Sequence, residues 1–127
     1  MQVKKVFEYA VIRVVARVER GEFLNAGVIV FSKSDSYLGM KYAVCAEKLR
    51  VLYDEIDLDE IQCQLETFEK ICLGDPSGGP IAALDLPSRF RWLTAKRSTV
   101  IQCSEVHPGL SSDPSSTLEK LYAELVS

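Results

Sequence analysis

Groups that can donate, accept and titrate are most concentrated in residues 97–109. This stretch holds the chain's single histidine, His107, together with Ser98 and Ser104. A histidine can act as a general base near neutral pH, and a serine hydroxyl beside it can act as a nucleophile. The Ser-x-x-His spacing is not diagnostic, however, because catalytic triads are recognised in three dimensions. His107, Ser98 and Ser104 are therefore catalytic candidates without a supporting motif, and His107-Pro108-Gly109 equally indicates a loop.

Arginines form a second group with possible chemistry. Arg13 and Arg17 fall on the same side of a strand predicted at residues 7–18, because strand side chains alternate. If a late strand at residues 99–103 pairs beside them, Arg97 would join them. A guanidinium group binds carboxylate or phosphate with two parallel hydrogen bonds, so such a cluster would suit an anion. The alternative is that these arginines are solvated or paired with the chain's excess acid.

Asn25 is a polar residue within the apolar run at residues 24–31. A buried amide needs a hydrogen-bond partner, and we expect Arg97 or Ser98 to supply it. Gly27, in the same run, indicates a bulge or the close approach of another backbone. The candidate ligand-binding residues are Arg13, Asn25, Arg97 and Ser98.

Hydrophobic periodicity predicts an α+β fold in a single domain over residues 1–127. We expect an antiparallel sheet, made of an N-terminal β-meander plus a late strand, with about three helices packed mainly on one face. Trp92 should pack into the core with Arg91 pointing outward. Strands are predicted at residues 7–18, 24–31, 38–44, 91–95 and 99–103. Helices are predicted at residues 46–53, at 57–72 and after Asp113, with a Gly/Pro-rich loop at 74–80.

Composition narrows the class of protein. The net charge of -3 and the pI near 5.2 argue against bulk nucleic-acid binding, which needs a basic surface. The four cysteines form no CxxC pair, so a zinc site is unsupported. There is no Walker A loop and no Rossmann glycine pattern, and we expect no cofactor. No apolar run reaches the roughly 20 residues of a membrane helix, and no signal peptide is evident. We expect free thiols, a cytoplasmic location and no membrane partner.

Several short motifs resemble one known bacterial family, the domain-of-unknown-function 3037 family. The resemblance implies no established activity, so no catalytic role is transferred. Members are often encoded beside a HipA-like serine/threonine kinase, which implies a possible partner. The motifs are residues 9–13, 22–28, 89–93, Arg97-Ser98, 107–110 and Asp113-Pro114.

Two classes of function follow. The first is a small accessory or interaction module, for which the resemblance implies a role as partner or regulator of a HipA-like kinase. The second is a small enzyme or an anion- or nucleotide-binding protein that uses the Arg/Asn/Ser/His cluster. A pocket that gathers these side chains would favour the second class, whereas an exposed apolar patch would favour the first.

Overall fold

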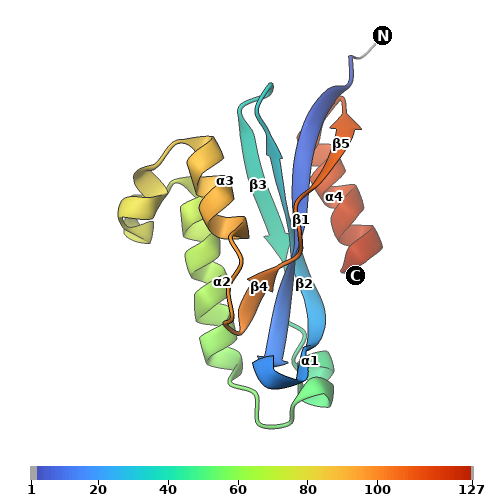
Figure 1. The fold of residues 1–127 in the computed structure, drawn as a ribbon, viewed down its shortest axis with the longest axis vertical. Helices are drawn as coiled ribbons and strands as arrows, with labels where there is room; N and C mark the ends of the chain where they lie inside the picture. The colour runs from blue at the N-terminus through green and yellow to red at the C-terminus, as the bar shows by residue number, and fades with distance from the viewer. Residues whose placement is uncertain (1–2, 127) are drawn as a thin grey trace.

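The computed structural model describes residues 3–126, without the side chain of Val18. Within this range five strands form one antiparallel sheet in the order β3–β2–β1–β4, and β5 also pairs with β1 (Figure 1). The strands are β1 (Lys5–Arg17), β2 (Glu22–Ser32), β3 (Tyr37–Tyr42), β4 (Ile101–Cys103) and β5 (His107–Ser111). The α-helices are α1 (Ala46–Leu52), α2 (Leu58–Leu73), α3 (Leu86–Thr94) and α4 (Pro114–Leu125). The predicted α+β fold with its N-terminal meander is confirmed, with four helices in the described residues.

The β1–β2 pair is antiparallel, as predicted. Gly21 closes the connection with φ +68°, a backbone conformation that side chains disfavour. Further along, Ile12 faces Gly27 while Arg13 faces Asn25, so β2 carries one extra residue, a β-bulge. The bulge expected around Asn25 is therefore present, and it places Asn25 opposite Arg13.

Gly27 also allows β3 to approach closely. A Cβ atom at this position would lie 2.7 Å from the carbonyl oxygen of Lys41 and 2.8 Å from the Cβ of Tyr42. Both distances are below van der Waals contact, so a side chain at Gly27 would push β3 away. The expected close backbone approach is confirmed.

Apolar side chains cover both faces of the sheet, because alternate residues of each strand point in opposite directions. One face carries the larger core, in which Ile12 and Ile29 pack with Leu49 of α1, Leu65 of α2 and Leu93 of α3. The opposite face carries a smaller core under α4. Its buried members are Phe7, Val28, Val30 and Leu118. Three helices thus share one face, and α4 covers part of the other.

Helix α3 replaces the strand predicted at residues 91–95, and this prediction is wrong. The Asp85 side chain caps the helix by accepting a 2.9 Å hydrogen bond from the backbone N–H of Ser88. Pro87 occupies the first turn, where its missing N–H is tolerated. Phe90 and Leu93 are buried at helical spacing. The Asp85 cap and Pro87 therefore start a helix where a strand was predicted.

The other helix ends follow the sequence closely. Asp57 caps α2 through a 3.0 Å bond from the N–H of Glu60, and Asp113 caps α4 through a 3.2 Å bond from the N–H of Ser115. The Gly/Pro-rich segment at 74–80 follows α2, whose C-cap is Gly74, and short 3-10 helices form at Pro76–Gly78 and Pro80–Ala83.

Candidate functional site

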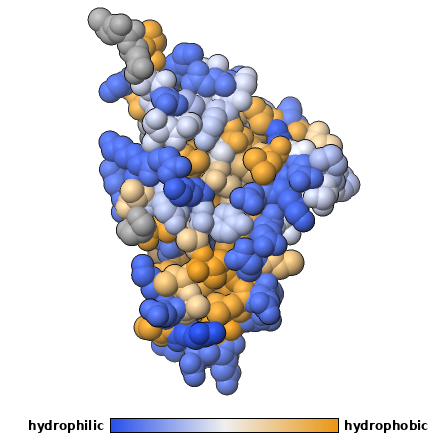
Figure 2. Space-filling model, turned by 180° about the vertical axis from the view of Figure 1, so that it is seen from behind, coloured by the Kyte–Doolittle hydropathy of each residue, from blue (hydrophilic) through white to orange (hydrophobic). Residues whose placement is uncertain are grey.

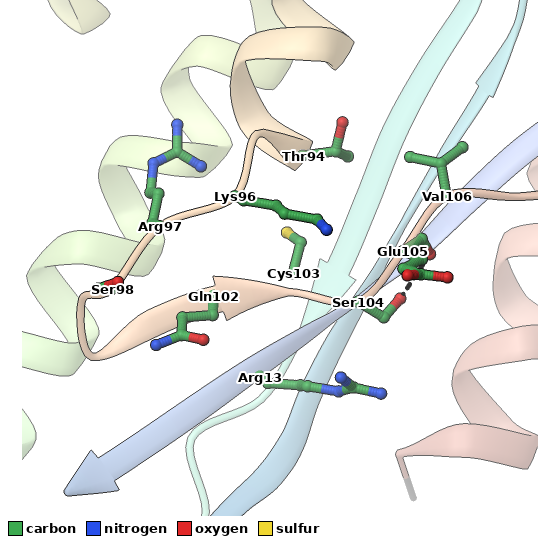
Figure 3. A pocket seen from close by; sticks show the side chains of 10 residues that line it. All are labelled: Arg13, Thr94, Lys96, Arg97, Ser98, Gln102, Cys103, Ser104, Glu105 and Val106. Atoms are coloured by element: carbon green, nitrogen blue, oxygen red, sulfur yellow. Dashed lines mark hydrogen bonds between the residues drawn. The ribbon is translucent and has the colours of Figure 1, made fainter. Parts of the chain in front are cut away.

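An open groove of about 730 Å³ lies beside β4, and we call it the β4 groove (Figure 3). The fold builds it because β4 pairs with β1, with Arg13 opposite Gln102 and Ile12 opposite Cys103. Pairing with β1 therefore brings the residues around β4 next to Arg13. The groove is lined by Arg13, Thr94, Lys96, Arg97, Ser98, Gln102, Cys103, Ser104, Glu105 and Val106.

Arg97 belongs to the structure of α3. Its guanidinium donates hydrogen bonds to the carbonyl oxygens of Trp92, of Leu93 at 2.9 Å and of Ala95 at 3.3 Å. It also lies over the rings of Trp92 and Phe68. Figure 3 shows the side chain turned toward α2 and away from Arg13. The donors of Arg97 are therefore used to cap the C-terminal end of α3.

Trp92 lies beneath this guanidinium at the margin of the larger core. Its side chain is half-buried and meets Phe68 edge-on at 6.0 Å between ring centroids, whereas Arg91 is exposed. The expected orientation of these neighbours is present, although on a helix instead of a strand. The indole faces Arg97 as well as the core.

Arg13 differs from the other half-buried arginines. Its Nε atom is enclosed and has no hydrogen-bond partner among the described residues. The guanidinium carbon lies 4.2 Å from the centre of the Phe23 ring, in cation–π contact. The Nε of Arg89 is likewise enclosed without a partner, but its terminal nitrogen Nη1 donates to the carbonyl oxygens of Ile71 and Cys72 at the end of α2. Arg13 is thus a cation at the groove with unused donors.

Ser104 serves the sheet. Its buried hydroxyl accepts a 2.8 Å hydrogen bond from the N–H of Val11 and donates a 2.9 Å bond to the carbonyl of Glu105. It thereby replaces a ladder bond where the chain passes from β4 to β5. Ser98 is exposed on the groove wall. Both hydrogen bonds of the Ser104 hydroxyl are to backbone groups, so its role is structural and it is a poor nucleophile.

Asn25 lines a different, smaller cavity of about 110 Å³, bounded by α1, β2 and α4. Its amide nitrogen donates a 3.1 Å bond to the carbonyl of Leu125, and its Oδ1 atom is enclosed without a donor. The expected partner, Arg97 or Ser98, is therefore wrong. α4 supplies the partner because it packs on the face of β2 where Asn25 points.

His107 is the first residue of β5, so the loop predicted at His107-Pro108-Gly109 is wrong. A proline is tolerated there because β5 is an edge strand, where a missing N–H can face solvent. The imidazole is exposed and lies beside the ring of Tyr9, with 5.4 Å between centroids. His107 is not among the residues that line the β4 groove. The groove therefore unites Arg13, Arg97, Ser98 and Ser104 without Asn25 or His107.

The cysteines are free thiols. Burial raises the pKa of Cys72 to about 12 and that of Cys103, on the groove wall, to about 11. Both thiols therefore stay protonated and poorly nucleophilic near neutral pH. Over residues 3–126, no group of three or more His, Cys, Asp or Glu side chains is arranged to hold a metal ion.

A second surface was not anticipated from the sequence. Val6 and Leu110 are cross-strand partners of β1 and β5, and their side chains are 59% and 64% exposed. They lie on the same face as Ala10 and Ile12, because residues of even number alternate to that side of β1. We call this pair the β5 patch. No sequence signal identified it, because exposure depends on where the helices end.

The helices leave the β5 patch bare. Figure 1 shows α2 and α3 on the β3 side of the sheet, away from β5. On the reverse side, Figure 2 shows apolar areas interrupted by hydrophilic side chains.

In the part of the chain that is described, no helix has both the length and the apolar character needed to cross a membrane.

These features define an α+β protein with a five-stranded antiparallel sheet and helices on both faces. The chain belongs to the family described as "Protein of unknown function (DUF3037)", which matches residues 9–126. The resemblance found in the sequence motifs is confirmed. Comparison with curated proteins and with solved structures finds no match.

Proposed function

We propose that this protein is an accessory module that binds a protein partner through the β5 patch. The observation that carries the proposal is the exposed pair Val6 and Leu110 on the face of β1 that elsewhere holds the main core. Exposed apolar side chains that adjoin one another on a sheet are suited to a partner surface. Covering them would extend the existing core beyond the helices.

The edge of β5 favours face-on packing over strand addition. Pro108 has no N–H to donate to an added strand, and proline is one of the devices that protects sheet edges. A partner would therefore contribute apolar side chains that lie across Val6 and Leu110. The missing N–H of Pro108 at the β5 edge therefore favours an interface made by side chains over one made by backbone hydrogen bonds.

The partner in this proposal is a HipA-like serine/threonine kinase, which family membership suggests. The proposal places both proteins in the bacterial cytoplasm, where thiols such as the four free cysteines remain reduced. An enzymatic role is less well supported, because His107 lies outside the β4 groove and the Ser104 hydroxyl is committed to backbone groups.

Titration calorimetry between the two purified proteins tests the proposal. The double variant Val6→Asp/Leu110→Asp should weaken binding at least tenfold, because each carboxylate would have to be desolvated at the interface. The matched control is Val51→Asp/Leu73→Asp, which changes side chains that are 88% and 71% exposed on α1 and α2. The control should bind like the wild type. Equal affinities for both double variants, or no binding by the wild type, would contradict the proposal.

A second copy of this chain could also cover the β5 patch. Sedimentation of the wild type and of Val6→Asp/Leu110→Asp measures this directly. A wild-type dimer that the substitutions convert to a monomer would assign the patch to self-association and overturn the kinase as its occupant.

A further inference from the structure

We propose that Arg13 is the centre of a binding site for the oxyanion group of a small molecule, a phosphate or a carboxylate, in the β4 groove. This site is separate from the β5 patch and does not rest on the proposed partnership. It also differs from the cluster expected from the sequence, since Arg97, Asn25 and His107 have other places in the fold.

The guanidinium of Arg13 has donors that no described residue uses. Three arginines are half-buried in the described chain: Arg13, Arg89 and Arg97. Arg89 and Arg97 donate to carbonyl oxygens at helix ends. Arg13 makes no ion pair or hydrogen bond through its side chain to a described residue, and its Nε is enclosed. The Nε of Arg89 is enclosed without a partner too, so what sets Arg13 apart is that its terminal N–H groups have no acceptor. Polar groups of a partly buried side chain are usually satisfied, and an oxyanion in the groove would supply the acceptor.

The guanidinium of Arg13 is held in place by its neighbours. Phe23 lies against its face at 4.2 Å, and β1 pairs on both sides of Arg13, with Asn25 and Gln102. Guanidinium N–H groups lie in the plane of the group, so stacking on a ring leaves them free to donate. A positioned guanidinium loses less entropy on binding a ligand than a mobile one does.

The other residues that line the β4 groove also suit an anion. Lys96 adds a second cation, and Ser98 adds an exposed hydroxyl. Glu105 is the acidic member of the lining and makes no ion pair with Arg13 or Lys96. This locally basic surface belongs to a chain of net charge -3. The volume of about 730 Å³ is that of a small-molecule site.

Figure 3 shows how these groups lie. Arg13 extends from β1 on the Ser104 and Glu105 side, Lys96 extends from the opposite wall, and Arg97 turns away. In this view β4 lies between the Arg13 and Lys96 side chains, so Arg13 is the primary contact of a bound oxyanion. The predicted determinants of binding are Arg13 first and Lys96 second.

The test is titration of the protein with inorganic phosphate, and separately with succinate, at constant ionic strength, followed by amide NMR shifts. The wild type should show saturable shifts at residues 13 and 96–105 with at least one of the two anions. Phosphate alone would assign a phosphoryl ligand, and succinate alone a carboxylate ligand. Shifts that do not saturate, or that are absent with both anions, would overturn the site.

Three variants make the result specific. Arg13→Gln should raise the apparent Kd about tenfold or more, because a charged hydrogen bond to the anion is lost. Arg13→Lys keeps the charge without the fork and should bind with intermediate affinity, so it also serves if Arg13→Gln folds poorly. Arg50→Gln removes the same charge from an exposed position on α1 and should bind like the wild type. Equal weakening by Arg13→Gln and Arg50→Gln would reduce the effect to net charge and overturn the proposal.

The two proposals fail independently. Val6→Asp/Leu110→Asp should leave the anion titration unchanged, because neither residue lines the β4 groove. Loss of kinase binding with retained phosphate binding, or the reverse, would identify which of the two is wrong.

Discussion

Arg97 and Trp92 form one unit at the end of α3. The guanidinium carbon of Arg97 lies 4.4 Å from the centre of the indole, and the same group donates a hydrogen bond to the Trp92 carbonyl. The last carbonyls of a helix lack partners within the helix and carry partial negative charge. Burial lowers the pKa of Arg97 from its ordinary value, yet arginine remains charged at neutral pH. The cation therefore caps the helix while covering the tryptophan.

Replacing Arg97 by glutamine should lower the free energy of unfolding by about 1–3 kcal/mol, because carbonyl oxygens at the end of α3 lose their donor. Arg97→Lys should not restore this, since one ammonium cannot reproduce the planar fork. Urea unfolding measures the change. Arg91→Gln, at an exposed position on the same helix, is the control and should stay within about 0.5 kcal/mol of the wild type. Equal losses in Arg97→Gln and Arg91→Gln would refute the capping role.

Ser104→Ala should also lower the unfolding free energy by about 1–3 kcal/mol, because the N–H of Val11 would be buried without an acceptor. Ser98→Ala removes an exposed hydroxyl from the same groove and should cost much less. Chemical denaturation of the two variants compares them directly. If Ser104→Ala were as stable as Ser98→Ala, the hydroxyl would not be bridging the strands, and a chemical role for Ser104 would regain support.

Gly27→Ala should destabilise the sheet by about 1–3 kcal/mol, since the added methyl would lie 2.7 Å from the Lys41 carbonyl oxygen and overpack the β2–β3 contact. Gly39→Ala is the matched change on β3. There the nearest atoms belong to the side chain of Tyr37, which can rotate away, so the cost should be smaller. Thermal unfolding that ranks Gly39→Ala as the more harmful substitution would contradict this explanation.

Acid should weaken the start of α3. Hydrogen bonds from Ser88 lower the pKa of Asp85 below its ordinary value of 3.8. A carboxyl group whose pKa is lower in the folded state stabilises the protein above its unfolded pKa, and this contribution disappears as the pH falls through the folded pKa. Asp85→Asn keeps a capping oxygen that does not titrate. Its stability should therefore fall less than that of the wild type between pH 5 and pH 2, as followed by urea unfolding at each pH. A parallel decline in both proteins would exclude the cap as a source of acid sensitivity.

Local signals in the sequence predicted most of the fold. Asp57 and Asp113 cap helices through contacts with nearby N–H groups, and Gly27 marks a close backbone approach. These features depend on neighbouring residues or on the alternation of a single strand, so they can be read without knowing the topology. The strand predicted at residues 91–95 is wrong because Asp85 and Pro87, a few residues earlier, start a helix that continues through them.

The candidate site was less accessible to prediction. Arg13, Arg97 and Ser98 do share a groove, but the donors of Arg97 are spent on α3 and Asn25 faces α4. Which side chain satisfies a buried amide depends on helix packing over distances that periodicity does not encode. The exposure of Leu110 likewise follows from the extent of α2 and α3.

Amide hydrogen exchange of the complex tests most directly the proposal that a kinase partner covers the β5 patch. We predict slower exchange on binding at residues 5–9 of β1 and 107–111 of β5, with residues 58–73 of α2 unchanged. Protection confined to α2 or to residues 96–105 at the β4 groove, with unchanged exchange in β5, would contradict the account.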